Sequence, residues 1–208
     1  MSSRLATIVA VTLAVAFGAA PLAASAATAP SRTSRVEVRP VDAQGHLLAG
    51  YRVGHEFGRA HCLRGGIADN QAYRCFAGNE IFDPCWVQDS ATAHVICLRD
   101  PWHHTVARLR VTKGFDNGYA GGPSRSPWAI RLVSGPRCVG VQGASGAVAG
   151  HGISYVCLDG KTVLLDEPDM AHSLWTIRVA RDTGGYHYRR IGRHAIAAAY
   201  FGRRSLVG

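Results

Sequence analysis

The sequence predicts a mainly β protein, a sandwich or barrel-like domain of short strands that is rich in loops and stapled by disulfide bonds. Short segments rich in Val, Ile, Leu and aromatic residues recur between Gly, Pro, Asp and Asn turns. No window of about eleven residues or more carries the apolar stripe of an amphipathic helix. Six cysteines are spread between Cys62 and Cys157. Together these observations favour a short-stranded β fold over a helical one.

The N-terminus has the pattern of a secretory signal peptide. Residues 1–4 are a short basic start, residues 5–20 form an apolar run, and small residues follow up to an A-x-A site that ends at Ala26. We therefore expect residues 1–26 to be removed, leaving a soluble protein secreted from the cell. A retained membrane anchor is the alternative, but the run is shorter than the roughly 20 apolar residues that a spanning helix needs. No later apolar segment is long enough, so no membrane anchor is predicted.

The remaining chain divides at changes of composition. Residues 27–45 are predicted to be a flexible lead-in, and residues 46–208 a single disulfide-stapled domain. Within it, the turn-rich segment 113–127 joins lobes 46–112 and 128–208. Each lobe is small for an independent core, so we expect the lobes to share strands.

The strands are predicted where apolar and polar residues alternate, or where a short apolar run lies between turns. The stretches VARLRV and WTIRV alternate apolar with basic residues, as a strand with one buried face does. Residues 68–74 fit a short helix before Cys75, and residues 195–200 fit a last strand or a helical turn. The predicted strands are residues 36–38, 86–88, 94–98, 106–111, 128–133, 139–141, 153–158, 163–165, 174–179 and 186–191.

The even number of cysteines in an exported chain predicts a disulfide framework. Sequence alone leaves 15 connectivities open. Pairing between nearest neighbours is favoured, because the last two cysteines lie in two predicted strands joined by a Gly-rich turn. The favoured pairs are Cys62 with Cys75, Cys85 with Cys97, and Cys138 with Cys157.

Two other uses of cysteine are disfavoured. A catalytic cysteine with a histidine partner would leave an odd thiol unpaired, which disfavours it. The spacing contains no C-x-x-C, which removes the usual pattern of a thioredoxin-like redox pair and of a zinc knuckle.

The charge is basic and is carried almost entirely by arginine. The whole chain has 23 basic and 14 acidic residues, and the predicted signal removes only Arg4, which leaves a net charge of +8. Such a surface attracts polyanions, which outside a bacterial cell means anionic wall polymers above all. No run of five or more basic residues occurs, so a soluble surface with scattered charge is the plainer interpretation. No sequence-specific nucleic-acid binding is predicted.

No intact metal or cofactor motif is present. The stretch HEFGRAH resembles H-E-x-x-H, but position 59, where the second zinc ligand would lie, is Arg. A looser metal site could draw on His46, His55, His61 or the pair at residues 103–104, although scattered histidines are usually surface groups. We therefore predict no metal and no cofactor. No G-x-S-x-G or complete phosphate loop occurs.

Acidic and aromatic residues are further candidate sites. Asp166, Glu167 and Asp169 could supply a glycosidase pair, but a solvated turn ended by Pro168 is favoured. The four tryptophans could form a sugar-stacking platform, but packing in the core is favoured. They are Trp86, Trp102, Trp128 and Trp175.

From Cys62 onward the chain resembles a group of exported six-cysteine proteins of actinobacteria. The resemblance is carried by AYRCFAGNEIFDPCW and HVICLRDPW, and then by PWAIRL, RCVGVQGA, YVCLDG and LWTI. Some members are similar to ectodomains attached to bacterial Ser/Thr kinases. The resemblance implies secretion and a disulfide scaffold, and for the ectodomains a ligand-sensing or wall-contacting role. This chain carries no kinase domain, so a free binding protein is the reading that remains.

The sequence therefore predicts a secreted, non-catalytic binding protein that contacts cell-wall polymer, a small ligand or a protein partner. The alternative is a small secreted hydrolase of wall glycan or peptide, using a histidine with Glu56, Glu80, Asp83 or Asp166. A protease inhibitor with residues 113–127 as its bait is a third option. No catalytic or binding residue is assigned, and the chain is predicted more as a non-enzyme than as an enzyme.

Overall fold

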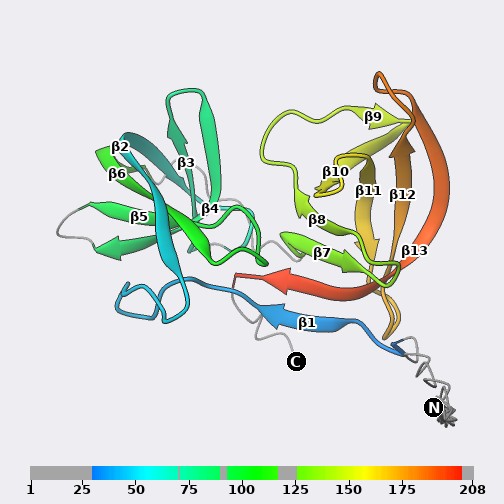
Figure 1. Cartoon of the computed structure of the whole chain (residues 1–208), viewed down its shortest axis with the longest axis horizontal. Coiled ribbons are helices and arrows are strands. Elements are labelled where there is room, and N and C mark those ends of the chain that lie inside the picture. The colour runs from blue at the N-terminus through cyan, green and yellow to red at the C-terminus, as the bar shows by residue number, and fades with distance from the viewer. Residues whose placement is uncertain (1–29, 70, 90–92, 117–125, 203–208) are drawn as a thin grey trace, which may run out of the picture.

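The computed structural model describes residues 30–69, 71–89, 93–116 and 126–202. These residues form two closed sheets without a helix, and Figure 1 shows the two sheets as separate lobes. The prediction of a mainly β, barrel-like, disulfide-stapled fold is confirmed. The predicted signal segment, residues 1–26, lies outside the described residues. Nowhere in the described ranges is there a helix long and apolar enough to cross a membrane.

The strands vary from two to fourteen residues in length. In chain order they are β1 (Ser34–Glu37), β2 (Arg52–Arg64), β3 (Tyr73–Ala77), β4 (Glu80–Asp89), β5 (His94–Cys97), β6 (Thr105–Asp116), β7 (Ala129–Leu132), β8 (Arg137–Gly140), β9 (Ala147–Val148), β10 (His151–Cys157), β11 (Thr162–Asp169), β12 (Thr176–Asp182) and β13 (Tyr188–Phe201).

The first barrel is formed by β2 to β6. Neighbours along the chain pair antiparallel, and a parallel pairing of β2 with β6 closes the ring. In β6 the alternation is that of the predicted strand, because Ala107, Leu109 and Val111 join the barrel core while Arg110 is exposed. Strand β2 was not among the predicted strands, since Gly54 and Gly58 interrupt it and most of its residues are exposed.

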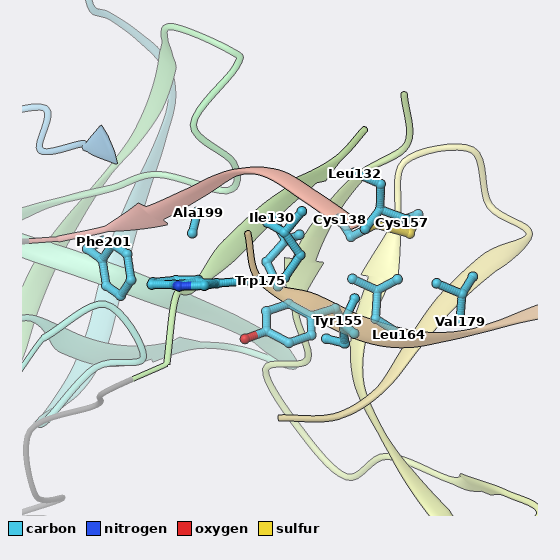
Figure 2. Packing of buried hydrophobic residues seen from close by; sticks show 12 residues of the cluster. Ile130, Leu132, Cys138, Tyr155, Cys157, Leu164, Trp175, Val179, Ala199 and Phe201 are labelled. Atoms are coloured by element: carbon cyan, nitrogen blue, oxygen red, sulfur yellow. A yellow bond between two sulfur atoms is a disulfide. The ribbon is translucent and has the colours of Figure 1, made fainter. Parts of the chain in front are cut away.

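The second barrel is formed by β7, β8 and β10 to β13. Pairing of β13 with β7 closes this sheet on itself, while β1 extends it beside β13 and β9 adds to β10. Its core contains Ile130, Leu164, Trp175, Ile177 and residues around them. Figure 2 shows the Trp175 ring beside Phe201, and the two ring centroids are 6.3 Å apart.

The three disulfides join the same pairs of cysteines that the spacing favoured. Each bridge links residues directly opposite each other on neighbouring antiparallel strands: β2 with β3, β4 with β5, and β8 with β10. In the first barrel the sulfurs of Cys75, Cys85 and Cys97 lie within 4.8 Å of one another. The two bridges of that barrel are therefore a substantial part of its core.

Several local expectations differ from the structure. The lead-in contains β1, and the Thr33 hydroxyl donates to the carbonyl of Ile196 at 2.7 Å, so this part of residues 27–45 belongs to the second barrel. The predicted helix at residues 68–74 is not found in the described residues 68–69 and 71–74, because the Asp69 carboxylate accepts the N–H of Ala72 and shapes a turn into β3. Residues 195–200 are strand, inside β13.

The joining segment and the lobes also differ from expectation. Residues 113–116 of the predicted joining segment belong to β6, and residues 117–125 lie outside the described part of the chain. The expectation that the lobes share strands is wrong for the described residues, because no strand pairing links one closed sheet to the other.

The two barrels meet instead across a seam of buried side chains. Trp86, Ile96 and Val106 from the outside of the first barrel pack in one cluster with Trp128 and Ala129 of the second. All five are almost fully buried. The seam thus gives the two barrels a common core.

A buried carboxylate, Asp83, lies beside this seam. One carboxylate oxygen accepts the N–H of Ile67 at 2.6 Å, and the other accepts Nε–H of Arg74 at 2.7 Å. Gly66 allows this approach, since a Cβ there would lie 2.8 Å from the Asp83 oxygen. The side-chain amide of Gln142, from the second barrel, donates to the Asp83 carbonyl. Asp83 therefore holds a turn of the first barrel and touches the second, and it belongs to the scaffold.

Burial raises the pKa of the Asp83 carboxyl to about 6, although the Ile67 N–H and the Arg74 guanidinium favour the charged form. The folded state therefore binds a proton between about pH 4 and 6 that the unfolded state has lost, so this group's contribution to stability falls as pH rises through that window. We expect the free energy of unfolding of Asp83→Asn, relative to that of the wild type, to rise by up to about 3 kcal/mol between pH 4 and pH 7. Urea unfolding at each pH measures this difference.

Asp42→Asn is the control for this pH dependence. Desolvation acts to raise the pKa of Asp42, but the backbone N–H and ring of His46 hold it below its ordinary value. Asp42→Asn should therefore be less stable than the wild type at neutral pH, and this difference in the free energy of unfolding should shrink as pH falls. That is the opposite of the trend expected for Asp83→Asn. A constant difference between wild type and Asp83→Asn from pH 4 to 7 would contradict the prediction.

Candidate functional site

The strongest candidate site is a pocket at one end of the first barrel. Strands β2, β4 and β6 run in the same direction, so their first residues gather at this end together with the β5–β6 connection. The pocket has a volume of about 460 Å³, within the range of ligand sites, which often occupy barrel mouths. We call it the mouth pocket. Its lining residues are His55, Phe57, Glu80, Phe82, Arg99, Asp100, His103, Thr105, Val106 and Ala107.

The β5–β6 connection brings a histidine to the mouth pocket. Asp100, which is buried, accepts the backbone N–H groups of Trp102 and His103 through Oδ1, each at 2.9 Å. Its Oδ2 lies 2.7 Å from Nδ1 of His103. Because a carboxylate accepts, Nδ1 carries the proton, and Nε2 is the ring nitrogen left to accept from a ligand. Asp100 therefore orients the ring of His103 rather than facing a ligand itself.

A second ion pair lies on the β4 side of the mouth pocket. Nη2 of Arg99 donates to Oε2 of Glu80 at 2.6 Å, with both side chains exposed to solvent. The Arg99 guanidinium also lies over the Phe82 ring, 5.5 Å from its centroid. Phe82 in turn packs edge-on against Phe57, with ring centroids 4.8 Å apart. Polar groups at the rim thus surround an aromatic floor.

This arrangement can bind a ligand that is polar on one side and hydrocarbon on the other. The Arg99 guanidinium donates, the second oxygen of Glu80 accepts, and His55 has no partner among the described residues, which leaves its ring nitrogens available. Phe57 offers an apolar surface, and the buried Phe82 ring packs against it. Saccharide and peptide units have this mixed chemistry.

The structure brings together some of the sequence candidates and separates others. His55, Glu80 and His103 meet at the mouth pocket. His46 instead contacts Asp42 on an exposed turn, and His104 packs on the Tyr51 ring with centroids 5.0 Å apart.

The remaining candidates of the first barrel also lie apart from the mouth pocket. His61 lies further along β2, opposite Phe76. Glu56 forms an ion pair with Arg108 outside the pocket lining, and Asp83 is buried in the scaffold.

The histidines do not gather into a metal site within the described ranges. The one group of three suitable ligand atoms found there consists of Cys75, Cys85 and Cys97, and all three sulfurs are in disulfide bonds. A sulfur in a disulfide is not the thiolate that binds zinc.

The acidic stretch in the second barrel differs from the predicted solvated turn. Asp166, Glu167 and Asp169 belong to β11, with a bulge between Leu165 and Asp169 that lets the strand bend, and Pro168 is buried. The hydroxyl of Ser126 donates to Glu167. The stretch does not form a solvated turn, because basic and hydroxyl side chains of neighbouring segments contact these carboxylates and the segment continues the sheet.

Asp166 contacts two basic side chains. Its Oδ2 lies 2.7 Å from Nη1 of Arg178 and 2.8 Å from Nδ1 of His151. Desolvation acts to raise its pKa, but the Arg178 guanidinium and His151 hold it below the ordinary value. A glycosidase acid needs a raised pKa. Asp166 is therefore set up as an ion-pair partner and not as a proton donor.

The tryptophans are core residues, as favoured. Trp86, Trp128 and Trp175 are buried. Trp102 is half-buried, and its Nε1–H donates to the Tyr200 hydroxyl at 3.1 Å. No row of exposed tryptophans therefore forms a stacking platform in the described structure.

Sequence reasoning missed Arg99 and Asp100. A signal for Asp100 existed, because an Asp followed by Pro and, three residues on, by His is typical of a turn in which the carboxylate caps the backbone. Arg99 carried no such signal, since its role depends on Glu80, which comes 19 residues earlier. No family model, curated protein or solved structure matches this chain.

Proposed function

We propose that this chain is a secreted, non-catalytic binding protein that holds a saccharide or peptide unit of a cell-wall polymer in the mouth pocket. The observation that carries the proposal is the joining of His55, Glu80, Arg99 and the Asp100-oriented His103 around the floor of Phe57 and Phe82. The signal-like N-terminus and the three disulfides support a place outside the cell.

Binding is favoured over hydrolysis by the partners of the acids. Glu80 forms an ion pair with Arg99, and both carboxylate oxygens of Asp100 accept hydrogen bonds from residues of its own turn. A hydrolase of glycan needs one carboxyl that is protonated and a second that is free to act on the sugar or on water. The pocket instead presents fixed donors and acceptors, which is what recognition requires.

The first test is retention of the purified mature protein on isolated Gram-positive cell walls, at low and high salt, before and after acid removal of anionic polymers. Retention that survives both treatments supports binding of a wall saccharide or peptide unit. We expect His55→Ala and Arg99→Gln each to weaken binding of soluble wall glycopeptide fragments about tenfold. His61→Ala, on the same strand but outside the pocket, is the matched control and should bind as the wild type does.

Hydrolysis is the second candidate, and one observation favours it: Glu80 lies in the same pocket as His55 and His103. Release of soluble fragments from the walls, lost in Glu80→Gln, would establish it in place of binding alone. Retention without fragments supports the binding protein. If fragment affinity is the same in wild type, His55→Ala and Arg99→Gln, the mouth pocket is not the site.

A further inference from the structure

A second feature, at one end of the second barrel, is not used by the mouth pocket. Arg181 near the end of β12 lies directly opposite Arg189 at the start of β13, and on its other side it pairs with Thr162 of β11. Residues directly opposite each other in an antiparallel pair point to the same face, about 5 Å apart. Lys161 precedes Thr162 in the adjacent β10–β11 turn. We call Lys161, Arg181 and Arg189 the basic end.

Like charges in directly opposed positions destabilise a sheet. Three residues earlier on β12, Arg178 lies directly opposite Arg193 of β13. Each of these two arginines has an ion-pair partner: Asp166 lies 2.7 Å from Arg178, and Asp169 lies 3.2 Å from Arg193. Neither Arg181 nor Arg189 has an ion-pair partner among the described residues, and both are exposed. The fold therefore gives each arginine of the Arg178/Arg193 pair an ion-pair partner and leaves Arg181 and Arg189 without one among the described residues.

The acids near the basic end are used by the backbone. The Asp159 carboxylate accepts the N–H of Lys161 and both the N–H and hydroxyl of Thr162. The Asp182 carboxylate accepts the N–H of Gly184. These bonds fix the two turns. Desolvation acts to raise the pKa of Asp159, but the N–H groups of Thr162 and Lys161, together with the charge of Arg181, hold it below its ordinary value. Asp159 therefore offsets part of the charge of Arg181 without forming an ion pair with it.

The two turns also enclose a hollow. The N–H of Asp182 donates to the Lys161 carbonyl at 2.7 Å and ties the turns together. Between them lies a hollow of about 570 Å³, lined by residues 160–161 and 181–184. Tyr186 stands at the tip of the β12–β13 connection with 84% of its surface exposed. The basic end therefore borders a concave surface with one aromatic side chain nearby.

We propose that the basic end binds a linear phosphodiester polymer of the cell wall. Two guanidinium forks on one face can each donate to phosphate oxygens, and Lys161 adds a point charge at the rim of the hollow. Single-stranded nucleic acid is the less favoured occupant, because it is bound through a succession of aromatic platforms, and Tyr186 is the single largely exposed aromatic side chain in the described structure. This site does not depend on the mouth pocket.

The test compares the wild type with Arg181→Gln/Arg189→Gln and with Arg64→Gln/Arg110→Gln. The control pair removes the same charge from exposed strand positions of the first barrel, where Arg64 and Arg110 have no ion-pair partner among the described residues. The probe is linear poly(glycerol phosphate), and affinity is measured at several salt concentrations. We expect the Arg181/Arg189 variant to bind at least about tenfold more weakly and its slope of log K against log salt to flatten by about 1.5. The control should change little.

The same variants give a stability readout that separates binding from structure. Since removal of a like-charge pair relieves repulsion, the Arg181/Arg189 variant should melt at the wild-type temperature or above it. An equal loss of affinity in the control pair would reduce the effect to net charge and overturn the proposal. A lower melting temperature of the Arg181/Arg189 variant would show that the two arginines stabilise the fold, which would overturn the proposal. Tighter binding of oligothymidylate than of poly(glycerol phosphate) would overturn it as well and assign the surface to nucleic acid.

Discussion

Reduction of the three disulfide bonds is expected to unfold the protein without denaturant. The bridges close loops with sequence separations of 13, 12 and 19 residues, and in the chain-entropy model each such loop is worth roughly 3 kcal/mol. Together they contribute about 9 kcal/mol, which is comparable to the whole stability of a typical domain. Two of the bridges also fill the core of the first barrel, so a small β-barrel would lose both its cross-links and its packing there.

The measurement is urea unfolding with and without a reductant, followed by circular dichroism, with free thiols counted by mass spectrometry. Removal of single bridges provides the controls. Cys138→Ala/Cys157→Ala should lower the free energy of unfolding by about 3 kcal/mol and leave the first barrel folded. Cys62→Ala/Cys75→Ala should affect the first barrel in the same way. An unchanged unfolding midpoint after complete reduction would show that the bridges are dispensable.

Much of the fold was predictable because its signals are local. Alternation of apolar and basic residues predicted β6 and β12. Their inward-facing residues include Leu109 of β6 and Ile177 of β12. Each bridge joins two cysteines that lie directly opposite each other on antiparallel strands close together in the chain, so spacing along the chain favours the right pairs. In contrast, β2 gave no alternation, since its parallel pairing with β6 has several register shifts and the strand holds its place through a partner about 50 residues away.

The mouth pocket could be predicted only in parts. His55, Glu80 and His103 were each candidates, but nothing local says that they meet, because their approach depends on the closure of the barrel by β2 and β6. The same holds for the basic end. Arg181 and Arg189 are unremarkable in a sequence rich in arginine, and only the register of β12 and β13 shows that they are directly opposed.

Trp128→Ala is expected to lower the free energy of unfolding by about 3–5 kcal/mol, the usual cost of removing a large buried aromatic side chain. Trp128 is 1% exposed and lies in the seam cluster, together with Trp86 from the other barrel. Since no strand pairing joins the two sheets in the described structure, the seam is the chief contact between their cores. The loss should therefore also uncouple the barrels and split one unfolding transition into two.

Trp175→Ala is the matched control for this uncoupling, because Trp175 is equally a buried tryptophan but belongs to the core of the second barrel alone. It should cost a similar free energy without separating the transitions. Trp128→Phe separates packing from polarity: the indole Nε1 of Trp128 is buried with no hydrogen-bond partner among the described residues, so removing this N–H recovers part of the lost contact energy. Hydrogen exchange of β4 and of β11 reports the two barrels individually. If both barrels of Trp128→Ala still unfold together, their coupling does not run through this side chain.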